Sequence, residues 1–91
     1  MKKIQPFNIW VNGQTKTAQY LALILNNDNL LNQAVFYWAF YDEQQGKAGN
    51  KITDNTITLQ GADYTAFNTS INSNNYAWNW AAQTLGVTLI P

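Results

Sequence analysis

A chain of 91 residues without cysteine or histidine lacks disulfides and the usual zinc and copper ligands, both of which often support small cores. Five lysines balance five acidic residues, and arginine is absent. A neutral chain of this kind lacks the basic footprint that binds phosphate backbones, so we expect no nucleic-acid partner, and association is the support that remains for the core.

The first part of the chain predicts strands. Phe7–Val11 is rich in aromatic and β-branched residues and runs into Asn12-Gly13, a strong hairpin signal. With Gln14–Ala18 it predicts an opening hairpin. Tyr20–Leu25 is a further apolar run, which is more typical of a strand than of a helix, and the polar cluster Asn26–Asn29 predicts a turn after it.

The segment Ala34–Tyr41 has no polar alternation. Its two faces carry Phe36, Trp38 and Phe40 on one side and Val35, Tyr37 and Tyr41 on the other. Because an antiparallel strand with one wet face alternates between apolar and polar residues, this pattern predicts a central strand that is covered on both faces, by its own chain or by a neighbour.

The following residues predict a loop and another strand. Asp42–Asn50 is polar and contains Gly46 and Gly49, so we expect a loop long enough to be mobile. Thr56–Leu59 alternates well and predicts a strand with Ile57 and Leu59 directed inward.

The last third predicts helices. Ala62–Phe67 is expected to form a short helical turn, and a longer helix is expected to begin at Asn72 or Ser73 and to end at Gly86. Ile71 is expected to pack on Tyr76 as a hydrophobic staple. The apolar stripe of the longer helix consists of Ala77, Trp78, Ala81, Ala82 and Leu85, flanked by Tyr76 and Trp80, with Asn79 and Gln83 directed outward.

Val87–Ile90 predicts a final short strand. Together the elements indicate one α+β domain over residues 1–91: a mainly antiparallel sheet, with a short and a longer C-terminal helix packed on one face. The longest apolar runs fall short of a membrane span, and the basic start, Met1–Ile4, leads to Gln5-Pro6 rather than to an apolar signal core. We therefore expect a chain that is made in a cytoplasm and has no membrane partner.

The residues of catalysis are scarce, and we expect no enzyme, no catalytic residues and no cofactor. Without histidine there is no nucleophilic triad, and no glycine-rich phosphate cradle is present. A carboxylate pair such as Asp28 with Asp63 stays open as an alternative, although solvated charge is the simpler interpretation. Asn26–Asn29 offers oxygens for calcium, but a single acid favours turn chemistry, so no metal site is expected.

Aromatic residues are abundant: four tryptophans, five tyrosines and four phenylalanines. Two interpretations compete, because these rings can fill a small core or can serve as exposed anchors of an interface. Trp78 and Trp80 cannot share one helical face, so at least one tryptophan is expected to face a second surface. The candidate interface residues are Trp10, Trp80, Tyr76, Tyr37 and Tyr41.

Four stretches carry a resemblance to a known class of protein: Ile9–Gly13, Ala34–Tyr41, the bend Leu59–Tyr64, and Tyr76–Ala82 with the following Leu85-Gly86. In these stretches the chain resembles small virion-associated structural proteins of tailed bacteriophages. The resemblance implies a bacteriophage virion component, either a capsid auxiliary or decoration protein or a part of the tail and connector. It also implies self-association or contact with other virion proteins, in many symmetric copies, after synthesis in the host cytoplasm.

Two other classes remain open. Exposed tryptophan and tyrosine bordered by Asn and Gln would suit sugar rings, which predicts a carbohydrate-binding module. Such modules are usually all-β and secreted, which the helical last third does not favour. A small inhibitor or adaptor of one host protein is the third class, and no residue pattern separates it from a structural role.

Overall fold

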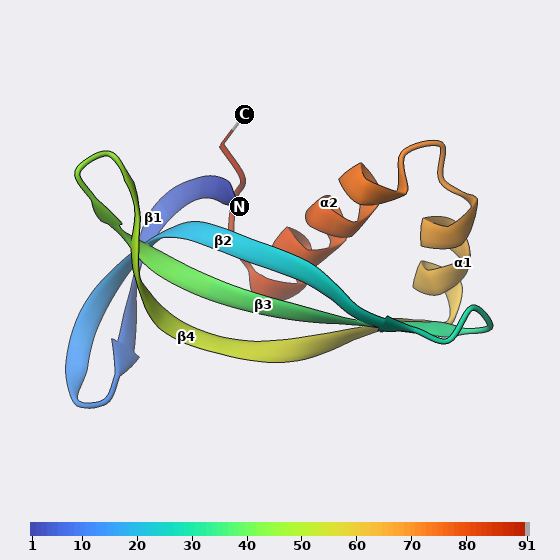
Figure 1. Cartoon of the computed structure of the whole chain (residues 1–91), viewed down its shortest axis with the longest axis horizontal. Helices are drawn as coiled ribbons and strands as arrows, with labels where there is room; N and C mark the ends of the chain where they lie inside the picture. Colours follow the sequence, from blue (N-terminus) through green and yellow to red (C-terminus); the bar gives the residue numbers. More distant parts are fainter. Residues whose placement is uncertain (91) are drawn as a thin grey trace.

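The computed structural model describes residues 1–90, which form a four-stranded antiparallel sheet in the order β1-β2-β3-β4 followed by two helices (Figure 1). The molecule is elongated and thin, with principal extents of 40 × 27 × 18 Å. The elements are β1 Lys2–Val11, β2 Gln14–Asp28, β3 Gln33–Gln44, β4 Lys47–Gln60, α1 Ala62–Thr69 and α2 Ser73–Leu85. The chain is therefore α+β, as the sequence predicts.

Two-residue turns join β1 to β2 and β3 to β4. Asn12 and Gly13 have φ angles of 51° and 75°, and Gln45 and Gly46 have φ angles of 54° and 80°. Positive φ at both central residues is the geometry that matches the twist of a tight hairpin. The opening hairpin predicted at Asn12-Gly13 is thus confirmed.

The mobile loop predicted over Asp42–Asn50 is wrong, because the residues on either side of the second turn are paired as strands. The Asp42 side chain accepts the backbone N–H of Asn50 at 2.7 Å across the hairpin. A Cβ at Gly49 would overlap the Gln44 side chain and press on the Asp42 side chain, so glycine leaves room for these β3 side chains against the β4 backbone. The glycine marks a close strand contact instead of a flexible segment.

β2 is longer than the sequence predicts. The expected strand Tyr20–Leu25 continues the second arm of the hairpin, and Asn26–Asp28 stay in the strand after an irregularity between Leu25 and Asn27. The polar cluster Asn26–Asn29 is therefore not the turn, which begins at Asn29. Asparagine lowers strand propensity without preventing pairing when a neighbouring strand supplies the ladder.

α2 begins and ends with defined caps. Asn72 accepts the N–H of Asn75 at 2.9 Å, and Gly86 adopts the left-handed conformation after Leu85. Both predictions are confirmed. The staple predicted between Ile71 and Tyr76 is wrong, because the Ile71 side chain is fully exposed.

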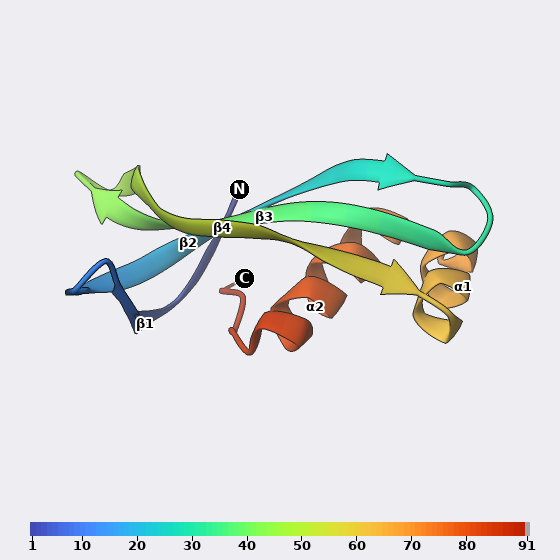
Figure 2. The same ribbon diagram turned by 90° about the horizontal axis from the view of Figure 1, so that it is seen from below.

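Two clusters of side chains lie between the sheet and the helices, which are on the same side of the sheet in Figure 2. The first contains Ile4, Ala18, Leu21, Phe40 and Trp78. The second contains Ala34, Leu59 and Tyr64, with Phe67, Tyr76 and Trp80 packed against it. Phe36 bridges toward both helices, with its ring centroid 5.8 Å from those of Phe67 and Trp80.

The segment after α2 returns to β1, but the structure does not confirm the final strand predicted over Val87–Ile90. Leu89 forms a single antiparallel bridge with Ile4. The N–H of Gln5 donates to the Thr88 carbonyl, and the N–H of Ile90 donates to the Lys3 carbonyl, both at 2.9 Å. One bridge pair with two flanking bonds is too short for a strand, yet it covers part of the β1 edge.

Candidate functional site

The sheet has a second face, on the side away from the helices, which we call the open face. Directly paired residues share a face, so the pairings Tyr20 with Tyr41, Ala22 with Ala39 and Ile24 with Tyr37 place these side chains together. The β4 partners on this face are polar. The open face consists of Tyr20, Ala22, Ile24, Val35, Tyr37, Ala39 and Tyr41, bordered by Lys51, Asp54, Thr56 and Thr58.

The covering that the sequence predicts for β3 is thus present on one face only. β3 is central, between β2 and β4, as predicted, and Phe36, Trp38 and Phe40 share one face, which is the face that meets the helices. Within residues 1–90, the open face receives no helix (Figure 2). Tyr37 and Tyr41 are only half-buried, and Ile24 is 58% exposed.

A polar triad borders the open face. The Tyr37 hydroxyl donates to Asp54 Oδ2 at 2.7 Å, and Lys51 Nζ lies 2.9 Å from the same oxygen. The hydrogen bond from Tyr37, with that from Lys51, lowers the pKa of Asp54. The bond to Asp54 in turn raises the pKa values of Tyr37 and Lys51. The triad is formally neutral and fixes the tyrosine ring on the sheet.

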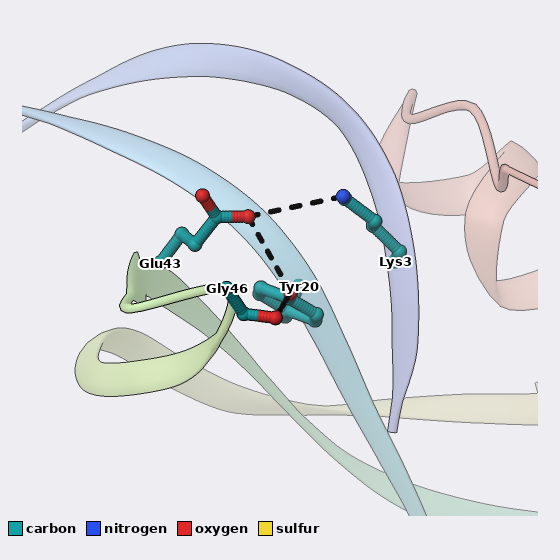
Figure 3. A network of polar contacts seen from close by, with 4 residues as sticks. All are labelled: Lys3, Tyr20, Glu43 and Gly46. Carbon is teal, nitrogen blue, oxygen red and sulfur yellow. Dashed lines mark hydrogen bonds and ion pairs between the residues drawn. The ribbon is translucent and has the colours of Figure 1, made fainter.

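A second polar network borders the open face where Lys3 of β1 pairs with Tyr20 of β2 (Figure 3). The Tyr20 hydroxyl lies 3.3 Å from the Gly46 carbonyl and 3.5 Å from Glu43 Oε1, and Lys3 Nζ is 3.8 Å from the same Glu43 oxygen. These long contacts tie three strands and the β3–β4 turn together. Lys3 and Glu43 carry opposite charges, so this pair is formally neutral.

The turn between β2 and β3 presents two exposed leucines, which we call the leucine tip: Leu30 is 84% and Leu31 78% exposed. Leu30 has a φ of 60°, which a branched side chain seldom adopts. Asp28 Oδ1 holds it by accepting the Leu30 N–H at 2.8 Å, and Asn29 Oδ1 accepts the Leu31 N–H at 2.9 Å. The turn is therefore held in shape with its leucines outside.

The carboxylate of Asp28 has a second partner. The Tyr64 hydroxyl donates to Asp28 Oδ1 at 2.8 Å, which raises the pKa of Tyr64 and ties α1 to the leucine tip. The Asn29 side chain also accepts the N–H groups of Asn32 and Gln33. These oxygens thus serve the turn and the α1 contact, which is the turn chemistry that the sequence favours over a calcium loop.

The five candidate interface residues lie in three different places. Trp10 is 74% exposed on the β1–β2 hairpin. Tyr76 and Trp80 are half-buried and pack on the second cluster, so they belong to the α2–sheet contact. Tyr37 and Tyr41 lie together on the open face, and there the structure joins them to Tyr20 and Ile24.

Sequence reasoning missed Ile24, Leu30 and Leu31 as surface residues. Leu30 and Leu31 lie between Asn29 and Asn32, at the end of an Asn-rich stretch that is typical of a turn. Their place in a turn is the signal that could have predicted their exposure. Ile24 could not be assigned a face before its pairing with Tyr37 was known, because a one-residue shift of register reverses every side chain of the strand.

The surface has hollows of about 210 to 270 Å³. One of about 260 Å³ lies between the β1–β2 hairpin and β4, and its charged lining residues are Lys16, Asp42 and Lys51. Another of about 210 Å³ is mainly apolar, between β2 and the start of α2. Over residues 1–90, no three acidic side chains gather as a metal site would require, and no helix is long and apolar enough to cross a membrane.

Comparisons with known proteins identify no relative: no family model, no curated protein and no solved structure matches the chain.

Proposed function

We propose that this protein is a non-enzymatic assembly protein that uses the open face of its sheet to pack against other proteins. The observation that carries the proposal is the central strand β3, which is apolar on both faces but covered by helices on one. Phe36 is 2% exposed, whereas its neighbour Tyr37 lies half-buried on the uncovered side.

The composition of the open face supports a protein partner. Its accessible centre consists of three half-buried tyrosines with Val35 and Ile24, beside the buried Ala22 and Ala39, and tyrosine is enriched among the residues that dominate binding energy. Its charges lie at the border, in the two pairs Lys51–Asp54 and Lys3–Glu43. An apolar centre with a polar rim is the usual anatomy of a protein interface.

The proposed setting is a bacteriophage particle, as the resemblance of Ile9–Gly13 and Ala34–Tyr41 to virion-associated proteins implies. The protein would act there as a capsid auxiliary or decoration protein, or as part of the tail and connector. A thin tile with an uncovered sheet suits a symmetric shell, because each copy presents the same surface to its neighbours.

The structure gives the carbohydrate-binding alternative less support. Of the four tryptophans, only Trp10 is largely exposed, because the other three belong to or pack against the two clusters under the helices. Glycan binding predicts that added polysaccharide quenches tryptophan fluorescence. A flat titration across a broad set of glycans would dismiss it.

The proposal is tested by sedimentation of the purified chain together with mass spectrometry of purified particles. We expect self-association at high concentration, or the protein in particles at a copy number that matches their symmetry. A folded monomer at every concentration that is also missing from particles would sink the proposal. Stable capture of one soluble host enzyme instead would favour the inhibitor or adaptor class.

A further inference from the structure

The β1 edge of the sheet is protected over its first half, whereas Phe7–Val11 makes no backbone hydrogen bond on its outer side within residues 1–90. The β1 edge is shielded near its start, where the Gln5 N–H and the Lys3 carbonyl bond to the segment Thr88–Ile90. Pro6, which has no N–H to offer, follows directly. Covered backbone and proline are common ways of preventing a further strand from pairing with an edge.

The β4 edge is open over its second half (Figure 2). The register irregularities of the β3–β4 ladder fall before Thr53, so Thr53–Gln60 pairs regularly with β3. This stretch contains no proline and a single charged residue, Asp54. Within residues 1–90, its outer side makes no backbone hydrogen bond with another segment. A long regular edge without such protection is a template for strand pairing.

The direction of the free backbone groups follows from the ladder. The N–H of Asn29 donates to the Gln33 carbonyl, which therefore points toward β2. Backbone groups alternate in direction along a strand, so the N–H and C=O groups of odd residues of β3 point toward β2, and those of even residues, including Phe36, point toward β4. The backbone groups of Ile57, the partner of Phe36, therefore point toward β3, and the backbone groups of its neighbours Thr56 and Thr58 point away from the sheet. The Thr56 N–H donates to the side chain of adjacent Asn55 at 2.8 Å, which substitutes for a missing strand.

We propose that the β4 edge pairs with the β4 edge of a second copy of this chain, antiparallel and about a two-fold axis at Ile57. The inference rests on the proposed assembly role and names its first contact. It joins two four-stranded sheets into one continuous sheet of twice the width. In this register the segment Asp54–Gln60 pairs along its whole length with the same segment of the second copy, and Thr56 of each copy lies opposite Thr58 of the other.

Three observations favour a second copy over an unrelated strand. Asp54, Thr56, Thr58 and Gln60, whose backbone groups point away from β3, meet the same residues of the second copy, so each outward N–H and carbonyl finds a partner once the Thr56 N–H gives up its bond to Asn55. No like charges face each other, because Asp54 lies opposite Gln60. Cross-strand threonine pairs stabilise antiparallel sheets, and Ile57 meets its own equivalent on the helix side.

The geometry also keeps the two copies compatible. A two-fold axis perpendicular to the sheet places the helices of both copies on the same side, and β4 lies at the border of the molecule away from α2 (Figure 1). The open faces of the two copies then form one surface of doubled width. The edge contact thus leaves the open face available for the next protein.

A charge-swap experiment on the full chain tests this pairing. The double variant Thr56→Lys with Thr58→Lys places lysines opposite lysines, and we expect its dimer to be weaker than the wild-type dimer by at least about tenfold. The variant with Thr56→Glu and Thr58→Glu should behave in the same way. An equimolar mixture of the two should regain a dimer, measured by sedimentation with one variant labelled.

The matched controls are Thr15→Lys and Thr15→Glu, which change charge at an exposed threonine of the β1–β2 hairpin and should leave the dimer unchanged. Circular dichroism identifies any variant that fails to fold. In that case Thr58→Pro, which removes one outward N–H of β4, is used in place of the misfolded variant. Dimers of wild-type strength in the lysine variant, or no recovery in the mixture, would overturn the edge pairing. If either result were found and the chain still associated in a way that Ile24→Lys abolishes, the edge pairing would be wrong and the proposed assembly role of the open face would stand.

Discussion

Phe36 and Tyr37 are neighbours in one strand, yet they belong to two different surfaces. The Phe36 ring is buried against Phe67 and Trp80 of the helices, whereas the Tyr37 ring lies on the open face with its hydroxyl on Asp54. Both faces of β3 are apolar in sequence, so apolarity alone does not separate a core from a contact surface. What separates them is the location of the helices.

We infer different roles for the two faces. Burial on the helix side stabilises the fold, because apolar area leaves water within one chain. On the open face Ala22 and Ala39 are already buried, whereas the half-buried tyrosines and the exposed Ile24 gain further stabilisation when another protein covers them. Substitutions on the helix side should therefore change the free energy of unfolding, and those on the open face should change association.

Phe36→Ala should have the largest effect. It removes a buried ring from beneath both helices and is expected to lower the free energy of unfolding by about 3 to 5 kcal/mol. Urea unfolding followed by circular dichroism at low concentration measures this. Tyr37→Ala is the matched control and should cost clearly less. Equal losses would show that the two faces do not differ in role.

Ile24→Lys should act on the other face. It places a charge in the middle of the open face, opposite Tyr37, where the side chain is already 58% exposed. We expect the unfolding free energy to change by less than about 0.5 kcal/mol. Association beyond the edge-paired dimer should weaken by about tenfold or more, about 1.4 kcal/mol. Thr15→Lys is again the control, and growth like that of wild type would count against the open face.

Asn72→Ala should destabilise α2, one of the helices that cover the buried face of the sheet. It removes the side-chain acceptor for the Asn75 N–H at the start of α2, a loss of about 1 kcal/mol in thermal or urea unfolding. The neighbouring control, Ile71→Ala, truncates a fully exposed side chain and should be almost neutral. A large cost at Ile71 would mean that this residue packs in solution.

Asp54→Asn should have the smallest effect, and a pH dependence. The Asp54 pKa is lowered from 3.8 in the folded chain, so its contribution to stability is present above about pH 4 and is lost as the pH falls through the folded pKa. The pKa values of Tyr37 and Lys51 are raised from 10.0 and 10.5, so their contributions are present below those values and are lost as the pH rises through the folded pKa values.

In Asp54→Asn the Tyr37 pKa should return toward 10.0, because the carboxylate that disfavours the phenolate is gone. Ultraviolet titration of the phenolate, with Tyr37→Phe to assign the signal, measures this shift. An unchanged Tyr37 pKa would show that the triad does not persist in solution.

Local chemistry explains which parts of the fold the sequence predicts. Asn12-Gly13 supplies positive φ to a hairpin, and Asn72 with Gly86 supplies both caps of α2, so these elements follow from residue type alone. The turn at Gln45-Gly46 was missed because glutamine is not a residue that favours positive φ. The length of β2 was missed because neighbouring β3 pairs with its Asn-rich end.

The candidate surface could be predicted only in part. The two-sided pattern of Ala34–Tyr41 predicts that β3 needs cover on both faces, and it places Tyr37 and Tyr41 on the same side. It does not show which face the helices take, and register alone brings Ile24 and Tyr20 beside these tyrosines. Tyr76 and Trp80, two of the predicted interface residues, are half-buried on α2 and pack on the second cluster.

Sedimentation equilibrium of the wild-type chain over a wide concentration range tests most directly whether the sheet surface is completed by another copy. The average mass should rise from the 10.3 kDa of one chain toward twice that value as concentration increases, and then beyond it as open faces meet. A folded species that keeps the mass of one chain at every concentration would contradict both the edge pairing and the self-association of the open face.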